Sequence, residues 1–142
     1  MSHPNDPVEQ LVGLLSRLPG YGRRSARRAV LKMLQDPQRL MLPLADGLRI
    51  AAEAVRRIDR VFEAEREVNG CPVAERLAHR QAVVAPLVAE LHAWMLETRG
   101  RMSRHNDVAK ALDYALTRWE AFTGFLADGR VCLTNNTPGF IE

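Results

Sequence analysis

The sequence predicts an all-α protein, and three observations support this. Apolar residues recur at spacings of three and four through most of the 142-residue chain, which is the period of one helix face. No run alternates in the manner of a strand before the last dozen residues. No apolar run reaches the roughly 18 residues of a transmembrane helix. The predicted order is an N-terminal helix-hairpin-helix, a long connecting helix and a C-terminal helical hairpin, with at most one short terminal strand.

Two short helices are expected first. Asp6 followed by Pro7 is typical of a helix N-terminus, because Asp caps free N–H groups and Pro fits the first turn. Pro19-Gly20 ends this helix. The second helix is expected from about Arg23 to Gln35, with small and apolar residues facing inward, and Asp36-Pro37 breaks or bends it.

A longer third helix is expected from about Pro43 to Val68. Its apolar residues are spaced 4, 3, 4, 3 and 4 apart, a heptad-like pattern that we call the 44–62 seam. The seam consists of Leu44, Leu48, Ala51, Val55, Ile58 and Phe62. It exceeds what the short N-terminal hairpin can cover, so it predicts a homo-oligomer unless the C-terminal helices cover it within one chain.

Two further helices and one candidate strand complete the prediction. The fourth helix carries Leu77 to Met95, with Pro86 as the site of a kink. The fifth opens near Asn106 or Asp107 and closes at Asp128-Gly129. Residues 130–134 are the candidate edge strand, and the turn residues Asn135-Asn136 follow it.

The basic residues are concentrated in the first forty percent of the chain. Residues 1–57 hold ten Lys/Arg against five Asp/Glu, and residues 58–142 hold ten against twelve, within a total net charge of +3. Such asymmetry indicates a polyanionic partner. The N-terminus has no signal-peptide pattern, and Cys71 and Cys132 lack partners at metal-ligand spacing. We therefore expect a reduced, cytoplasmic chain without membrane contact, metal or cofactor.

The stretch LPGYGRRSARR, residues 18–28, has the pattern of a DNA-binding hairpin. We expect Gly20 and Gly22 to take positive φ and to leave backbone amides open beside a helix N-terminus, where a phosphate oxygen binds. The cations that follow fall on one half of the second helix, and such a surface grips phosphates without reading bases. The predicted DNA-binding residues are Gly20, Tyr21, Gly22, Arg23, Arg24, Ser25, Arg27, Arg28 and Lys32. Phosphate binding does not explain Leu31 in this face, and the alternative is a plain turn beside a solvated charged face.

The N-terminal part resembles a known family. EQLVGLLSRLPGYGRRSARRAVLKML, followed by DPQRLMLPLADGLRIAAEAV, resembles the helix-hairpin-helix segment of the bacterial recombination mediator RecR over residues 6–55. The resemblance implies DNA binding in recombinational repair and a ring-like assembly. That family continues into a four-cysteine zinc module and a Toprim domain, and this sequence has no CxxC pair for the zinc module.

The remaining sequence resembles a different family. Residues 57–136, notably KALDYALTRWEAFTGFLADGR and the Asn pair, resemble the C-terminal part of DDE transposases of insertion-sequence family sixty-six. In that family the Asn pair precedes a metal-binding Glu, but Gly139 stands at that position here and Glu142 comes three residues later. The two catalytic aspartates belong to a region N-terminal to the match. The resemblance therefore implies that no catalytic residues are present, since two-metal chemistry needs converging carboxylates.

Two segments and three functional hypotheses follow. We expect residues 1–55 to be a RecR-like DNA-binding segment and residues 56–142 a truncated transposase region, joined by a gene fusion. The first hypothesis is a catalytically inactive, sequence-nonspecific DNA-binding protein related to recombination and transposition. The second is a transposase of family sixty-six by its C-terminal part. The third is a helical dimerisation module with no DNA role.

Overall fold

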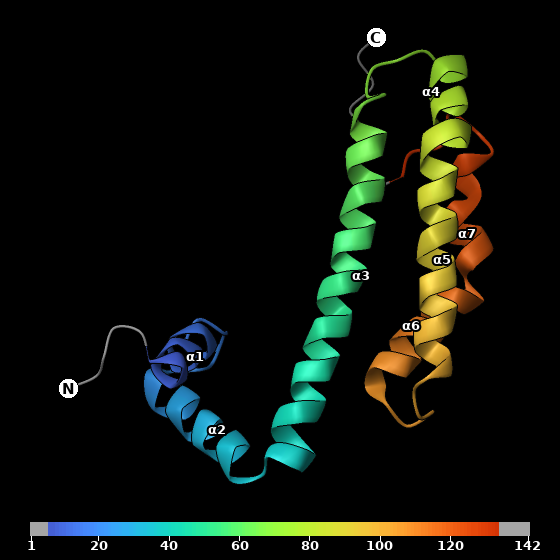
Figure 1. Cartoon of the computed structure of the whole chain (residues 1–142). Coiled ribbons are helices and arrows are strands. Elements are labelled where there is room, and N and C mark those ends of the chain that lie inside the picture. Colours follow the sequence, from blue (N-terminus) through green and yellow to red (C-terminus); the bar gives the residue numbers. More distant parts are fainter. Residues whose placement is uncertain (1–5, 134–142) are drawn as a thin grey trace. The chain divides into compact units, whose positions relative to one another are not determined.

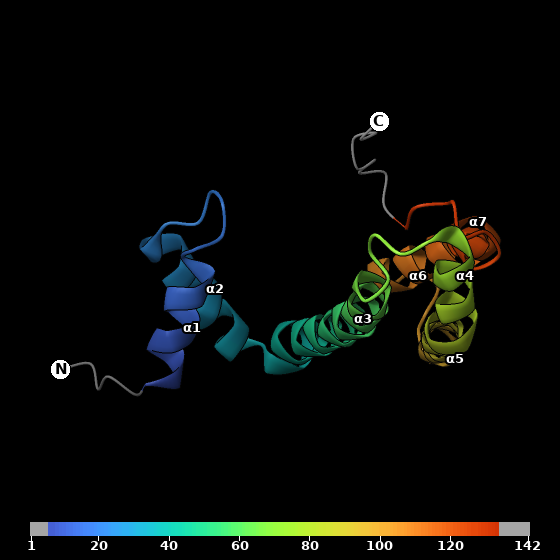
Figure 2. The same ribbon diagram turned by 90° about the horizontal axis from the view of Figure 1, so that it is seen from above.

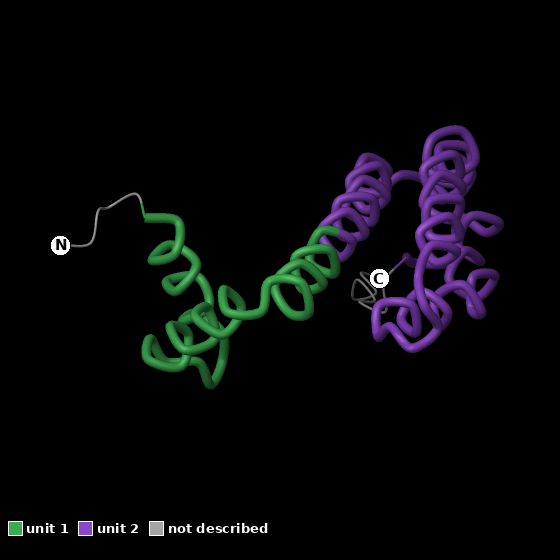
Figure 3. Tube along the Cα trace, turned by 60° about the horizontal axis from the view of Figure 1, so that its bottom comes forward, with its two compact units in different colours: residues 1–49 green, residues 50–142 purple. Residues whose placement is uncertain are grey.

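The structure is a computed structural model that describes residues 6–133. It is all-α, as predicted, and 77% helical. The chain divides into two compact units, residues 1–49 and 50–142 (Figure 3), and each is described by itself. No helix in the described part of the chain combines the length and apolar character needed to cross a membrane.

The first unit is a helical hairpin followed by a bend. Helix α1 spans Pro7–Leu15 and helix α2 spans Arg23–Gln35, while the π-helical turn η1, Pro37–Met41, leads into α3 (Figure 1). The two helices pack through one cluster of buried residues. That cluster is Val12, Ala26, Val30 and Met33, with Leu15 and Met41 against it.

The second unit begins within α3, which is continuous from Leu42 to Arg66. Helix α4 spans Val73–His79, the π-helical turn η2 spans Arg80–Val84, and α5 spans Ala85–Gly100. The chain then turns back through α6, Asp107–Thr117, α7, Trp119–Thr123, and the 3₁₀ turn η3, Gly124–Leu126. Figures 1 and 2 show α6 and α7 lying along α5.

Two apolar clusters hold the second unit together. The first joins α3, η2, α5 and η3 through Val61, Ala64, Val84, Val88 and Phe125. The second joins α5 to α6 through Leu91, Met95 and Leu112. Trp119 contacts both clusters, and its ring stacks on His92 with the ring centroids 4.6 Å apart.

Most predicted element boundaries are confirmed. Asp6 caps α1 by accepting a hydrogen bond from the Val8 N–H at 2.9 Å, and α2 has the predicted limits. Asn106 caps α6 in the same way, from the Val108 N–H at 2.8 Å. The long third helix is also confirmed, because α3 runs without a break through residues 54–58.

Three local predictions differ from the structure. A π-helical turn, Arg80–Val84, interrupts the predicted fourth helix directly before Pro86. The fifth helix is interrupted at Arg118, whose φ is −106° and ψ is 16°. Residues 130–133 form bends and coil, so no strand occurs within them, and Thr134 lies outside the described residues.

The 44–62 seam is largely exposed. Helix α3 buries Val61 and Ala64 in the second unit, on a different face from the seam. Leu48 is 63% exposed and Val55 is 57% exposed. Leu44 and Ile58 are exposed as well. The helices of the second unit therefore leave its seam residues Val55 and Ile58 uncovered.

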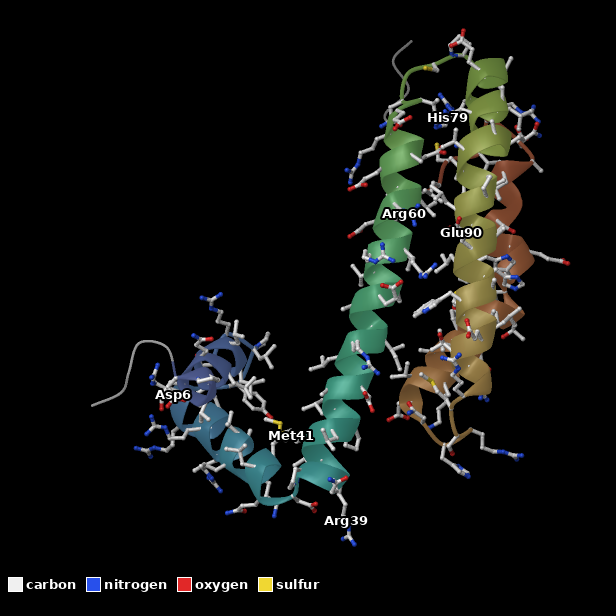
Figure 4. All side chains as sticks on the ribbon, viewed as in Figure 1. Asp6, Arg39, Met41, Arg60, His79 and Glu90 are labelled. Atoms are coloured by element: carbon white, nitrogen blue, oxygen red, sulfur yellow. The ribbon has the colours of Figure 1, made fainter. Side chains whose placement is uncertain are left out.

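Several polar side chains lie between α3 and the helices that follow it. The Arg60 guanidinium lies 3.7 Å from the Glu90 carboxylate, and His79 Nε2 lies 2.9 Å from the Ala64 carbonyl oxygen. Figure 4 shows Arg60 on α3 and His79 and Glu90 on the helices opposite it. Ion pairs and hydrogen bonds thus supplement the apolar clusters of this unit.

Gly129 marks the closest approach of backbone in the second unit. A Cβ at this position would collide with the Val73 carbonyl oxygen and lie 3.3 Å from the Leu77 Cβ. The Gly129 carbonyl also accepts a hydrogen bond from the Arg76 guanidinium at 3.0 Å. The position therefore requires a residue without a side chain.

We predict that Gly129→Ala destabilises the second unit by about 1–3 kcal/mol, because the added methyl forces the backbone of α4 away. Gly100→Ala is the matched control, since a Cβ there meets nothing within 4 Å. Urea unfolding followed by tryptophan fluorescence measures both, because Trp94 and Trp119 lie in this unit. Equal midpoints for the two variants would contradict the close approach.

Candidate nucleic-acid interface

The turn between α1 and α2 depends on one glycine in an unusual conformation. The Leu18 N–H donates to the Leu15 carbonyl at 3.1 Å, and the Tyr21 N–H donates to the Leu18 carbonyl at 3.0 Å. Between them Gly20 has φ of 78°, a region that residues with a Cβ rarely adopt. The positive φ predicted for Gly20 is confirmed. The same prediction for Gly22 is wrong, because its φ is −82° in extended backbone that suits any residue.

Gly22 instead leaves the N-terminus of α2 open. It is the N-cap residue, no side chain caps the helix start, and the first turn has no acidic residue. A Cβ at Gly20 or Gly22 would meet nothing within 4 Å. The N-termini of α1 and α6, in contrast, are closed by Asp6 and Asn106. Unpaired N–H groups and the positive end of the helix dipole make such an open terminus suited to an anion.

Three cations extend this site along α2. Arg24, Arg28 and Lys32 are spaced four residues apart, which places them within an arc of about 80° on the helix circumference. All three are exposed. Within residues 6–133 none of them forms an ion pair with a carboxylate. The side chains are therefore available to an external anion.

Arg23 and Arg27 lie on a different side of α2, toward α1. The Arg23 guanidinium donates to Glu9 Oε2 at 2.8 Å, and Arg27 donates to Glu9 Oε1. The sequence analysis did not identify Glu9. Glu9 precedes the hairpin turn by nearly the same number of residues as Arg27 follows it, and the two numbers differ by about two. That mirrored position was the signal that could have identified the pair.

All nine predicted interface residues are exposed, and they lie in the turn before α2 or on α2 itself. They are Gly20, Tyr21, Gly22, Arg23, Arg24, Ser25, Arg27, Arg28 and Lys32. Leu31 is exposed too and lies between the free cations and the Glu9-bound arginines on the helix circumference. Its exposure has no explanation within the hairpin itself.

Carboxylates on α3 neutralise the basic residues that follow. Arg49 pairs with Asp46 at 3.0 Å, and Arg56 and Arg57 both pair with Glu53. The hydrogen bond from Arg56, together with that from Arg57, lowers the pKa of Glu53 to about 2. The positive charge of the N-terminal part is therefore concentrated on α2.

Residues 6–133 contain no group of three or more His, Cys, Asp or Glu side chains that could hold a metal ion. The Asn135-Asn136 pair, Gly139 and Glu142 lie outside the described residues.

A family model, described as the transposase IS66 family, matches residues 26–138. The chain belongs to the IS66 transposase family. One relative is an uncharacterized protein, y4hP, of Sinorhizobium fredii, with 47% identity over 105 residues. That alignment covers 74% of this chain and 18% of the relative.

This IS66 family member is also similar to recombination proteins. Recombination protein RecR of Granulibacter bethesdensis is 37% identical over 93 residues, which cover 66% of this chain and 46% of the relative. RecR of Methylorubrum extorquens is 50% identical over 48 residues, covering 34% of this chain and 24% of the relative. The chain thus spans less than half the length of these curated relatives. No solved structure matches it.

Proposed function

We propose that this chain is a catalytically inactive DNA-binding protein, related to recombination and transposition, that binds the phosphate backbone without reading base sequence. The contact surface is the open N-terminus of α2 together with the cations that follow it. The observation that carries the proposal is the set of Arg24, Arg28 and Lys32 on one exposed arc, unpaired and next to the open turn. Similarity to a transposase family and to recombination proteins supports DNA as the polyanion.

The division of the chain follows the same proposal. We assign residues 1–55 to a RecR-like DNA-binding segment and residues 56–142 to the transposase-derived region. The compact units, 1–49 and 50–142, lie close to this division, whereas the family match begins earlier, at residue 26. We place the protein in the cytoplasm, where DNA of a bacterial cell is accessible.

A second proposal concerns the 44–62 seam, whose exposure favours self-association. Leu44, Leu48, Val55 and Ile58 form one exposed apolar stripe on α3 with heptad spacing. No charged residue occupies a seam position. Two copies of the seam can therefore meet without burying charge, and the chain is a homo-oligomer through this stripe. Were the basic face of α2 only solvated, this dimerisation would be the chain's main role.

The DNA proposal predicts sequence-independent binding that weakens with salt. Three neutralised phosphates give a slope of about −2.7 in log affinity against log salt, from about −0.9 per phosphate. Arg24→Ala with Arg28→Ala should reduce the slope by about two and weaken all sequences alike. Fluorescence anisotropy with labelled duplexes of unrelated sequence measures this. Arg49→Ala with Arg56→Ala is the control of equal charge loss on α3, and an equal effect of the two pairs would contradict the assigned surface.

A substitution at Gly22 tests the turn while leaving every charge in place. Gly22→Val fits the extended backbone and the open space in the free protein, so it should preserve helix content by circular dichroism. The same side chain would occupy the space that a bound phosphate needs, so DNA affinity should fall at least tenfold. If Gly22→Val folds and binds as the wild type does, the hairpin is a plain turn.

Catalytic inactivity predicts that the purified 142-residue chain does not cleave or join DNA with Mg²⁺ or Mn²⁺. Gly139→Glu should not restore activity, because two further carboxylates are needed to hold both metal ions. Plasmid nicking and strand-transfer assays measure both proteins. Cleavage that a chelator abolishes would overturn the proposed inactivity.

The self-association proposal predicts dimers or larger assemblies in sedimentation at micromolar concentration. Leu48→Glu with Val55→Glu should give monomers, because charge would be buried in the seam. Leu42→Glu is the control, since Leu42 is also an exposed apolar residue of α3 but lies off the seam. A monomeric wild type would rule out assembly through the seam.

A further inference from the structure

One acidic side chain holds two of the five cations on α2. Each carboxylate oxygen of Glu9 accepts a hydrogen bond from a different arginine, Oε2 from Arg23 and Oε1 from Arg27. The Glu9 side chain is 21% exposed, while the two arginine side chains are 68% and 55% exposed. The Glu9 side chain is therefore only partly exposed, whereas the two arginine side chains that it binds extend into solvent.

We infer that Glu9 competes with DNA phosphates for Arg23 and Arg27, so that it sets how many phosphates the hairpin neutralises. This inference rests on the proposed DNA binding and concerns the same surface. The wild-type chain then binds through Arg24, Arg28 and Lys32. Arg23 and Arg27 become available to phosphates only when the Glu9 carboxylate releases them.

The chemistry of the two acceptors explains the competition. A carboxylate and a phosphate both bind a guanidinium through charge-assisted N–H···O bonds, so they use the same donors. A phosphate that takes either arginine leaves a mostly buried carboxylate with fewer partners, which costs free energy. The Glu9 carboxylate carries one negative charge and the two arginines carry two positive charges, so one positive charge remains. Release of Glu9 therefore adds between one and two phosphates to the site.

A purely structural role for Glu9 makes a different prediction. The two ion pairs connect α1 to α2, so they could serve only to hold the hairpin together. In that case loss of Glu9 would lower thermal stability and leave the salt dependence of DNA binding unchanged. The slope of log affinity against log salt therefore separates the two roles.

The experiment compares Glu9→Gln with Glu97→Gln. Both changes remove one negative charge. Glu9→Gln removes two Arg–Glu pairs, whereas Glu97→Gln removes one, the pair with Arg101 directly after α5. Arg23→Ala with Arg27→Ala is made in the wild type and in the Glu9→Gln background. Anisotropy titrations with one labelled duplex over a range of KCl give the slopes, and circular dichroism checks that each variant folds.

We expect Glu9→Gln to steepen the slope from about −2.7 to between about −3.6 and −4.5, one to two phosphates more. Glu97→Gln should leave it unchanged. Removing Arg23 and Arg27 should flatten the wild-type slope less than removing Arg24 and Arg28 does, and should cancel the gain in the Glu9→Gln background.

Two outcomes overturn the inference. The first is that the salt-dependence slope of the Glu9→Gln variant is no steeper than that of the Glu97→Gln variant. The second is that, with Glu9 present, the loss of Arg23 and Arg27 flattens this slope as much as the loss of Arg24 and Arg28. This second comparison does not require Glu9→Gln to fold. If losing Arg24 and Arg28 has no effect in the wild type, the proposed function fails and this inference fails with it.

Discussion

The second unit depends on the buried ion pair between Glu65 and Arg80. Arg80 is 1% exposed, and its guanidinium donates to Glu65 on α3, to the Phe125 carbonyl at 3.0 Å and to the Asp128 carbonyl at 2.9 Å. A buried charge is costly unless it is paired and its donors are satisfied. These three partners lie on α3, in η3 and directly after η3, so Arg80 on η2 connects all of these segments. The pair therefore determines which residues of these elements lie opposite one another, and the apolar side chains fill the space around it.

That arrangement also explains why the 44–62 seam is exposed. Glu65 must face Arg80, so α3 turns the face that includes Val61 and Ala64 toward η2 and α5. A straight helix cannot present the seam to the same neighbours, because the two sets of residues lie on different parts of its circumference. The seam residues therefore stay exposed once Glu65 faces Arg80. Their exposure follows from the packing of Val61 and Ala64 on another face of α3.

The sequence predicted what depends on neighbouring residues and missed what depends on distant ones. Helix limits followed from caps such as Asp6 and Asn106 and from the 4-3 spacing of α3, all of which act within one turn. The pairing of Arg80 with Glu65 was not predictable, since the two residues are 15 positions apart and meet only in the folded unit. The pairing of Glu9 with two arginines likewise needs the hairpin to be folded. The face of Arg24, Arg28 and Lys32 was predictable because it lies on one helix.

The family match and the candidate DNA surface overlap only in part, because the match includes Arg28 and Lys32 but begins after Arg24. The IS66 match extends over residues 26–138, most of which belong to the second unit. There the cations are mostly used internally: six of the ten Lys/Arg after residue 57 form ion pairs. Arg76 donates to two backbone carbonyls as well. Because phosphate binding requires cations that are not already neutralised, the second unit offers little for a DNA backbone. Function depends on local sites rather than on the fold that carries them, and here the site with available charge is the N-terminal hairpin.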